Sequence, residues 1–110
     1  MVNMIIRLLD RGDTGELLLE GSLNEASIAE TEKIFNEMAD RFNRIVLNMA
    51  LLDDVSPASL RALKQLNVKM RQNGGSLVLC SVNPTVTEVL QVTGYAGSLK
   101  IINNSAEKDK

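Results

Sequence analysis

The sequence predicts an α/β domain with a mixed sheet of about five strands and three to four helices, in the order β-β-α-β-α-β-α-β. Short apolar runs of strand length alternate with longer segments whose apolar residues recur every three or four positions. Two of the helical segments begin with a capping residue followed by proline. This alternation of strands and helices is typical of parallel strands joined by right-handed crossovers.

Length and composition limit the possible function classes. Of the 110 residues, 45% are hydrophobic and 24% are charged, so we expect one domain over residues 1–104 and a polar tail over 105–110. The absence of histidine excludes histidine-based triads, and a single cysteine excludes an intrachain disulfide. A net charge of -2 argues against a nucleic-acid partner. No apolar run approaches the roughly 18 residues of a membrane span, so we expect a cytoplasmic protein without membrane insertion.

The first part of the chain has the pattern of a β-hairpin followed by a helix. Residues 4–9 and 16–20 are predicted to be two mostly apolar strands, and the turn-forming residues 10–15 between them include two glycines and two aspartates. Ser27 and Glu30 have the spacing of a capping box, which predicts a helix starting near Ser27. Its core-facing stripe is expected to consist of Ile28, Thr31, Phe35, Met38 and Phe42.

Residues 45–47 form a continuous apolar run, which is typical of a central strand covered on both faces. We expect residues 50–55 to form a loop after this strand. Ser56 and Pro57 then begin the next helix as N-cap and first helical residue. The buried side of this helix is predicted to consist of Leu60, Leu63, Leu66 and Met70.

The last part of the chain repeats this organisation. Residues 77–80 are predicted to form a strand that is a parallel neighbour, or near neighbour, of the strand over 45–49. Asn83 and Pro84 begin the third helix, and Gly94 ends it. Residues 99–102 form a last strand.

Few residues are suited to catalysis. Asp53 and Asp54 are adjacent, and neighbouring carboxylates in an extended loop usually point apart, so a solvated loop is favoured over a metal or acid–base pair. Cys80 lies inside an apolar strand, where a thiol is usually a small inert hydrophobe. We therefore expect no catalytic residue, no metal and no cofactor.

Ser56 supports two interpretations. A serine in front of a helix-initiating proline is an ordinary N-cap. The same position also lies at the positive end of a helix dipole and at the carboxyl edge of a parallel sheet, where α/β folds place their sites. A phosphate on this serine would be stabilised there.

The spacing around Ser56, together with several other segments, resembles the STAS domain, and more narrowly the bacterial anti-sigma factor antagonists. The matching segments are 21–24, 46–49, Ser56 with Leu60, 74–75 and 76–86. The resemblance covers nearly the whole chain. It implies a switch protein without catalytic activity that regulates transcription by partner switching.

The resemblance also implies a site of regulation. In the family, an anti-sigma factor that is a serine kinase phosphorylates an Asp-Ser-Ser-Gly motif at the start of the second helix. Aligned without gaps, Ser56 takes the place of the aspartate, Pro57 that of the acceptor serine and Ser59 that of the glycine. A shift of one residue makes Ser56 the phosphoacceptor candidate, with Ser59 as the weaker alternative.

The partner-binding surface that the resemblance implies consists of Asn24, Asp53, Asp54, Ser56, Pro57, Ser59 and Arg61. The expected partner is an anti-sigma factor or serine kinase protein, and the chain is expected to be a monomer or a weak dimer. The alternative function is a STAS subunit that docks on a transporter ATPase.

Overall fold

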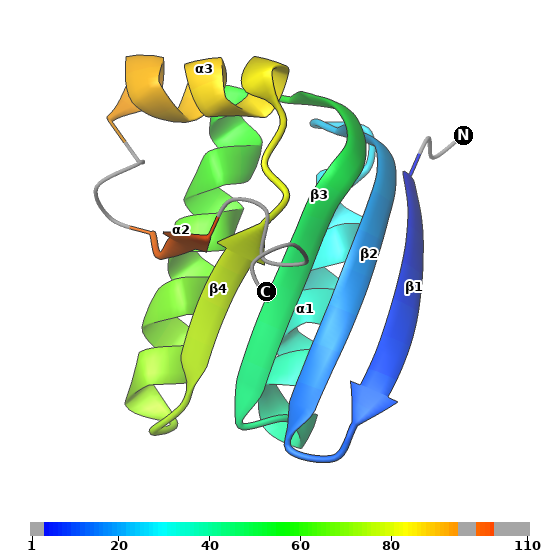
Figure 1. Ribbon diagram of the computed structural model, residues 1–110, viewed down its shortest axis with the longest axis vertical. Helices are drawn as coiled ribbons and strands as arrows, with labels where there is room; N and C mark the ends of the chain where they lie inside the picture. Colours follow the sequence, from blue (N-terminus) through cyan, green and yellow to red (C-terminus); the bar gives the residue numbers. More distant parts are fainter. Residues whose placement is uncertain (1–3, 95–98, 103–110) are drawn as a thin grey trace, which may run out of the picture.

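The strands lie in the sheet in the same order as they occur in the sequence (Figure 1). The computed structural model describes residues 4–94 and 99–102, and within these ranges the chain forms one five-stranded sheet. The elements are β1 (Met4–Arg11), β2 (Thr14–Leu23), α1 (Ile28–Arg41), β3 (Arg44–Val55), α2 (Pro57–Gln72), β4 (Ser76–Cys80), α3 (Pro84–Thr93) and β5 (Ile101–Ile102). The predicted element order is confirmed.

Strand directions follow the predicted scheme. β1 and β2 form the antiparallel hairpin, whereas β2, β3, β4 and β5 run parallel to one another. Ile45 is opposite Leu77 and Leu47 is opposite Leu79, so the two predicted central strands are direct neighbours. The last strand is shorter than the predicted range 99–102.

Helices α1 and α2 cover one face of the sheet, and α3 lies across the end where β3 and β4 finish (Figure 1). The α1 stripe faces the core as predicted, since Thr31, Phe35, Met38 and Phe42 are buried and Ile28 is half-buried. Alternate residues of β2 and β3 meet these helices from the sheet side. The core therefore lies between the helix pair and one face of the sheet. No helix within 4–94 and 99–102 is long and apolar enough to cross a membrane.

The expectation that residues 45–47 are covered on both faces is wrong. Ile45 and Leu47 are fully buried, but Val46 between them is only half-buried. The reason is that both α1 and α2 pack on the same face, which leaves this part of the opposite face without a helix (Figure 1). We call that opposite side the open face of the sheet.

The predicted capping box of α1 is also wrong. Ser27 has a helical backbone conformation, with φ -109° and ψ -12°, and its side chain forms no cap hydrogen bond. Its buried hydroxyl instead donates to the carbonyl of Ser22 at 2.9 Å and accepts from the amide of Asn24 at 3.1 Å. Burial against the end of β2 therefore directs this hydroxyl away from the helix it was predicted to cap.

The predicted starts of α2 and α3 and the predicted end of α3 are confirmed. The Ser56 side chain accepts from the amide of Ser59, and the Asn83 side chain accepts from the amide of Val86. Gly94 ends α3 in the left-handed conformation, with φ 81°. Helices α2 and α3 thus each begin at a defined residue after a parallel strand.

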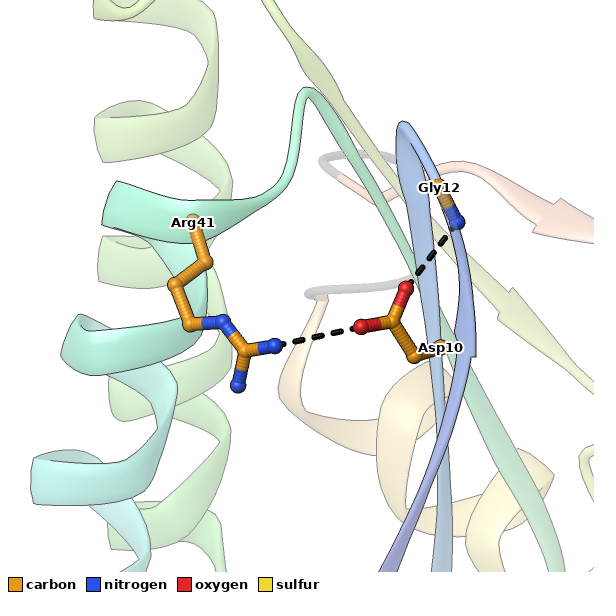
Figure 2. A network of polar contacts seen from close by, with 3 residues as sticks. All are labelled: Asp10, Gly12 and Arg41. Atoms are coloured by element: carbon orange, nitrogen blue, oxygen red, sulfur yellow. Dashed lines mark hydrogen bonds and ion pairs between the residues drawn. The ribbon is translucent and has the colours of Figure 1, made fainter.

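A polar network fixes the opposite end of the sheet, at the β1–β2 turn (Figure 2). One carboxylate oxygen of Asp10 accepts from the amide of Gly12 at 3.0 Å, and the other forms an ion pair with Arg41 of α1 at 3.2 Å. The Arg41 guanidinium also lies 4.9 Å from the centre of the Phe42 ring. Since the Asp10 and Arg41 side chains are about half exposed, this pair orients the turn more than it stabilises the fold.

The packing of α2 yields a test of the fold. Leu63→Ala should lower the free energy of unfolding by about 2–5 kcal/mol, because the Leu63 side chain on α2 is fully buried in the core. Gln65→Ala, on the exposed side of the same helix, should change it by less than about 0.5 kcal/mol. Urea denaturation followed by circular dichroism measures both values. Equal losses would show that the buried side of α2 is assigned incorrectly.

Candidate functional site

The parallel strands β2, β3 and β4 all finish at the upper end of the sheet in Figure 1. Open α/β sheets place their sites at the carboxyl ends of their strands. We use the name carboxyl edge for residues 22–27, 50–59 and 81–84, which follow or complete these strand ends. Most of the predicted site residues belong to it.

Residues 50–55 are not the predicted loop, because they continue β3 through two β-bulges. Leu18 is opposite Asn48 and Glu20 is opposite Leu51, so β3 holds one extra residue between these pairs. A second extra residue, Asp53, lies where the register shifts again before Asp54. Bulges of this kind redirect side chains near functional sites.

The bulges change the spacing of the buried positions. Ile45, Leu47 and Met49 alternate with exposed or half-buried residues, but the next buried positions, Leu52 and Val55, are each three residues further along. The apolar side chains therefore remain on the helix side, while the intervening pairs 50–51 and 53–54 are exposed. A simple period of two therefore does not describe this stretch.

Asn83 connects the bulged part of β3 to α3. Its side-chain amide donates to the carbonyl of Leu52 at 2.7 Å and approaches that of Met49 at 3.4 Å. Its side-chain oxygen accepts from the amide of Val86 at 2.9 Å. The chain reaches Asn83 from β4 through Ser81, which has a left-handed φ of 54°. The sequence alone indicates that Asn83 caps α3, but no feature of it indicates that the same side chain bonds to carbonyls of the bulged strand.

Ser56 lies at the junction of β2, β3 and α2. Its amide donates to the carbonyl of Leu23 at 2.9 Å, which joins the end of β2 to the start of α2. Its hydroxyl lies 2.9 Å from the hydroxyl of Ser59 and accepts from the Ser59 amide at 3.2 Å. Ser56 is partly exposed, whereas Ser59 is fully buried.

The Asn24 loop lies beside this junction, because Asn24 directly follows Leu23. The Asn24 side-chain oxygen accepts from the amide of Ala26 at 2.9 Å, and its carbonyl accepts from the amide of Ile28 at 2.8 Å. These bonds form a tight turn that leads into α1. Asn24 is half-buried, with its side chain engaged in the turn.

Asp53, Asp54 and Pro57 are exposed at the carboxyl edge. Asp54 lies opposite Ser22 in the register, so both elements contribute to one surface. The described parts of the chain contain no group of three or more histidine, cysteine or acidic side chains arranged to hold a metal. The edge is thus a surface on which exposed carboxylates lie beside half-buried hydroxyl and amide side chains.

Arg61 belongs to a different surface. It is exposed on α2 and lines a groove of about 630 Å³ with other residues of that helix. The groove is lined by Arg61, Lys64, Gln65, Val68, Lys69, Gln72 and Asn73. The structure therefore brings the Asn24 loop, Ser56 and Ser59 together and places Arg61 on the adjoining helix face.

The dual role of Asn83 can be measured against a residue that only caps. Ser56→Ala should cost about 1 kcal/mol through loss of the α2 cap. Asn83→Ala should cost more, by about 1–3 kcal/mol, because it also leaves the β3 carbonyls without their donor. Asn83→Asp retains the cap oxygen but places a carboxylate oxygen next to the β3 carbonyls, so it measures the loss of the donor together with the added repulsion. If urea denaturation gives equal losses for Asn83→Ala and Ser56→Ala, the bonds to β3 contribute nothing.

Comparison with known proteins identifies the family. Residues 7–108 match the STAS domain family. BtrV of Bordetella bronchiseptica, a protein assigned as an anti-sigma factor antagonist, is 32% identical over 87 residues, which are 78% of this chain and 75% of that protein.

Solved structures share the fold. The unphosphorylated anti-sigma factor antagonist SpoIIAA superimposes with a TM-score of 0.76 at 18% identity, covering 96% of this chain and 94% of SpoIIAA. The Thermotoga maritima protein TM1081, described as an anti-sigma factor antagonist, gives a TM-score of 0.76 at 23% identity, covering 94% and 89% of the two chains. SpoIIAA of Bacillus has also been solved in its phosphorylated form. The chain therefore belongs to the STAS domain family, and it is similar to anti-sigma factor antagonists of that family.

Proposed function

We propose that this protein acts by binding rather than catalysis, as an anti-sigma factor antagonist whose carboxyl edge binds an anti-sigma factor that is also a serine kinase. Phosphorylation of Ser56 by that kinase makes this protein dissociate from the anti-sigma factor. The observation that carries this proposal is the position of Ser56, a half-buried residue at the start of α2 and beside the Asn24 loop. The similarity to anti-sigma factor antagonists supports the class of partner.

The two candidate serines differ in access. Ser59 is fully buried, and its hydroxyl is within hydrogen-bond distance of the Ser56 hydroxyl. A kinase must reach the hydroxyl from solvent and leave three phosphate oxygens there, which a buried side chain does not permit without local unfolding. Access therefore favours Ser56 as the acceptor.

The charges around Ser56 indicate how a phosphate would act. The amino end of α2 stabilises an anion by about 0.3–1 kcal/mol, whereas the nearby carboxylates of Asp53 and Asp54 oppose it. These effects are opposite in sign, so folding should change little. A partner that packs over the edge instead meets a new dianionic group, which changes binding through charge and desolvation.

Binding to purified anti-sigma factors encoded in the same genome tests this proposal by titration calorimetry. We expect one of them to bind the parent protein. Ser56→Asp should then weaken that complex by at least about tenfold, because the new charge lies in the interface. Ser56→Ala should retain binding within about threefold, since it adds no charge.

Asn43→Asp is the matched control, because it adds the same charge at an exposed position directly before β3, at the opposite end of the sheet from the carboxyl edge. It should leave the affinity unchanged. Incubation with the anti-sigma factor and ATP, followed by mass spectrometry, should locate phosphate on Ser56. Labelling of Ser59 alone would refute the site assignment. Failure of every anti-sigma factor to bind, with a transporter ATPase binding instead, would refute the function.

A further inference from the structure

We propose that the first bulge of β3 creates a docking pocket on the open face, which takes an apolar side chain flanked by lysine or arginine from the anti-sigma factor. The pocket has a volume of about 490 Å³. It is lined by Met4, Ile5, Glu20, Gly21, Ala50, Leu51 and Asp53. The inference rests on the proposed function, because it assigns a second contact to the same partner.

The strand register explains how the pocket forms. Glu20 is opposite Ile5 of β1 and opposite Leu51 of β3, so these three residues form one row across the sheet. Neighbouring strand positions Leu19 and Leu52 are buried on the helix side, which places the row on the open face. Leu51 is in this row only because the bulge adds one residue after Asn48.

Two apolar side chains at this pocket remain exposed to solvent. Ile5 is 51% exposed and Leu51 is 48% exposed. Single exposed apolar residues are common on protein surfaces, but these two line the same concavity, which favours an interaction site. Burial of this pair by an apolar side chain would remove both from water, which favours a partner with such an anchor.

The charged residues of the pocket specify what surrounds that anchor. Glu20 and Asp53 contribute the two ionisable groups of the lining, and both are carboxylates. Asp54 adds a third exposed carboxylate next to the second bulge. A complementary partner segment therefore carries lysine or arginine beside its apolar residue.

The pocket is continuous with the carboxyl edge. Asp53 lines the pocket, and Ser56, three residues further along the chain, is the N-cap of α2. Ser22 and Asp54 are opposite each other between these two places. A partner that covers Ser56 is therefore in position to insert a side chain next to Leu51.

The test compares three single variants for binding to the anti-sigma factor that binds the parent protein. Leu51→Ser should weaken the complex by about tenfold through loss of the apolar contact. Asp53→Asn should weaken it by about threefold at low ionic strength, and by less at high ionic strength, because salt screens the charge. Val92→Ser, at a 79% exposed position of α3, is the control and should bind like the parent. Circular dichroism and urea denaturation verify that all variants fold.

A second experiment does not depend on the anti-sigma factor. Random peptides displayed on phage are selected on the parent protein, and the enriched peptides are tested against Leu51→Ser. We expect an aliphatic or aromatic residue beside lysine or arginine in the enriched peptides, and loss of binding to the variant. Enrichment of acidic peptides, or of peptides that bind parent and variant equally, would overturn the inference.

The outcomes separate the pocket from the proposed function. If Ser56→Asp weakens the complex but Leu51→Ser binds like the parent, the pocket inference is wrong and the proposed function stands. If no anti-sigma factor binds, the proposed function fails and the peptide selection decides the chemistry of the pocket. If sedimentation shows that Leu51→Ser instead separates a dimer of this chain, with partner affinity unchanged, the pocket is a self-association contact and the inference is wrong.

Discussion

The contact of the Asn83 side chain with β3 holds the carboxyl edge in its observed form. β-Bulges interrupt the regular ladder, and a carbonyl without a partner costs about 1–3 kcal/mol when it is shielded from water. The Asn83 amide donates to the Leu52 carbonyl and lies near that of Met49, while its oxygen caps α3. One side chain thus couples the course of β3 to the position of the helix across its end.

The properties of the edge follow from this arrangement. The bulges keep Met49, Leu52 and Val55 in the core and expose the residues between them, including Leu51 and Asp53. Beyond the second bulge, the bond from the Ser56 amide to the Leu23 carbonyl brings the ends of β2 and β3 together. One face of the sheet packs against α1 and α2. The proposed contacts with the anti-sigma factor therefore lie on the carboxyl edge and the open face.

Sequence reasoning predicted those features whose cause is local. The serine–proline and asparagine–proline pairs located the starts of α2 and α3, because capping and the fixed φ of proline act within one turn. The repeat of Thr31, Phe35 and Met38 gave the buried side of α1 correctly, because one helical period determines it. The same local logic selected Ser56 as a residue at the edge of the sheet.

Features that depend on distant contacts were not predictable in this way. Ser27 has the residue type and spacing of a capping box, but its hydroxyl binds the end of β2 instead. Residues 50–55 lack strand periodicity, because two bulges break the period. The bulged stretch is held by Asn83, which bonds to the Leu52 carbonyl 31 residues away in the sequence. The pocket at Leu51 requires β1, β2 and β3 together, so no segment alone indicates it.

Hydrogen–deuterium exchange of the protein, free and bound to the anti-sigma factor, tests the central claim that the carboxyl edge and its bulged strand form one binding surface. The account predicts slower exchange of backbone amides in residues 20–24 and 50–59 in the complex, with unchanged exchange in the β1–β2 turn at the opposite end of the sheet. Protection confined to the outward side of α2 or to the β1–β2 turn, with residues 50–59 unaffected, would contradict it.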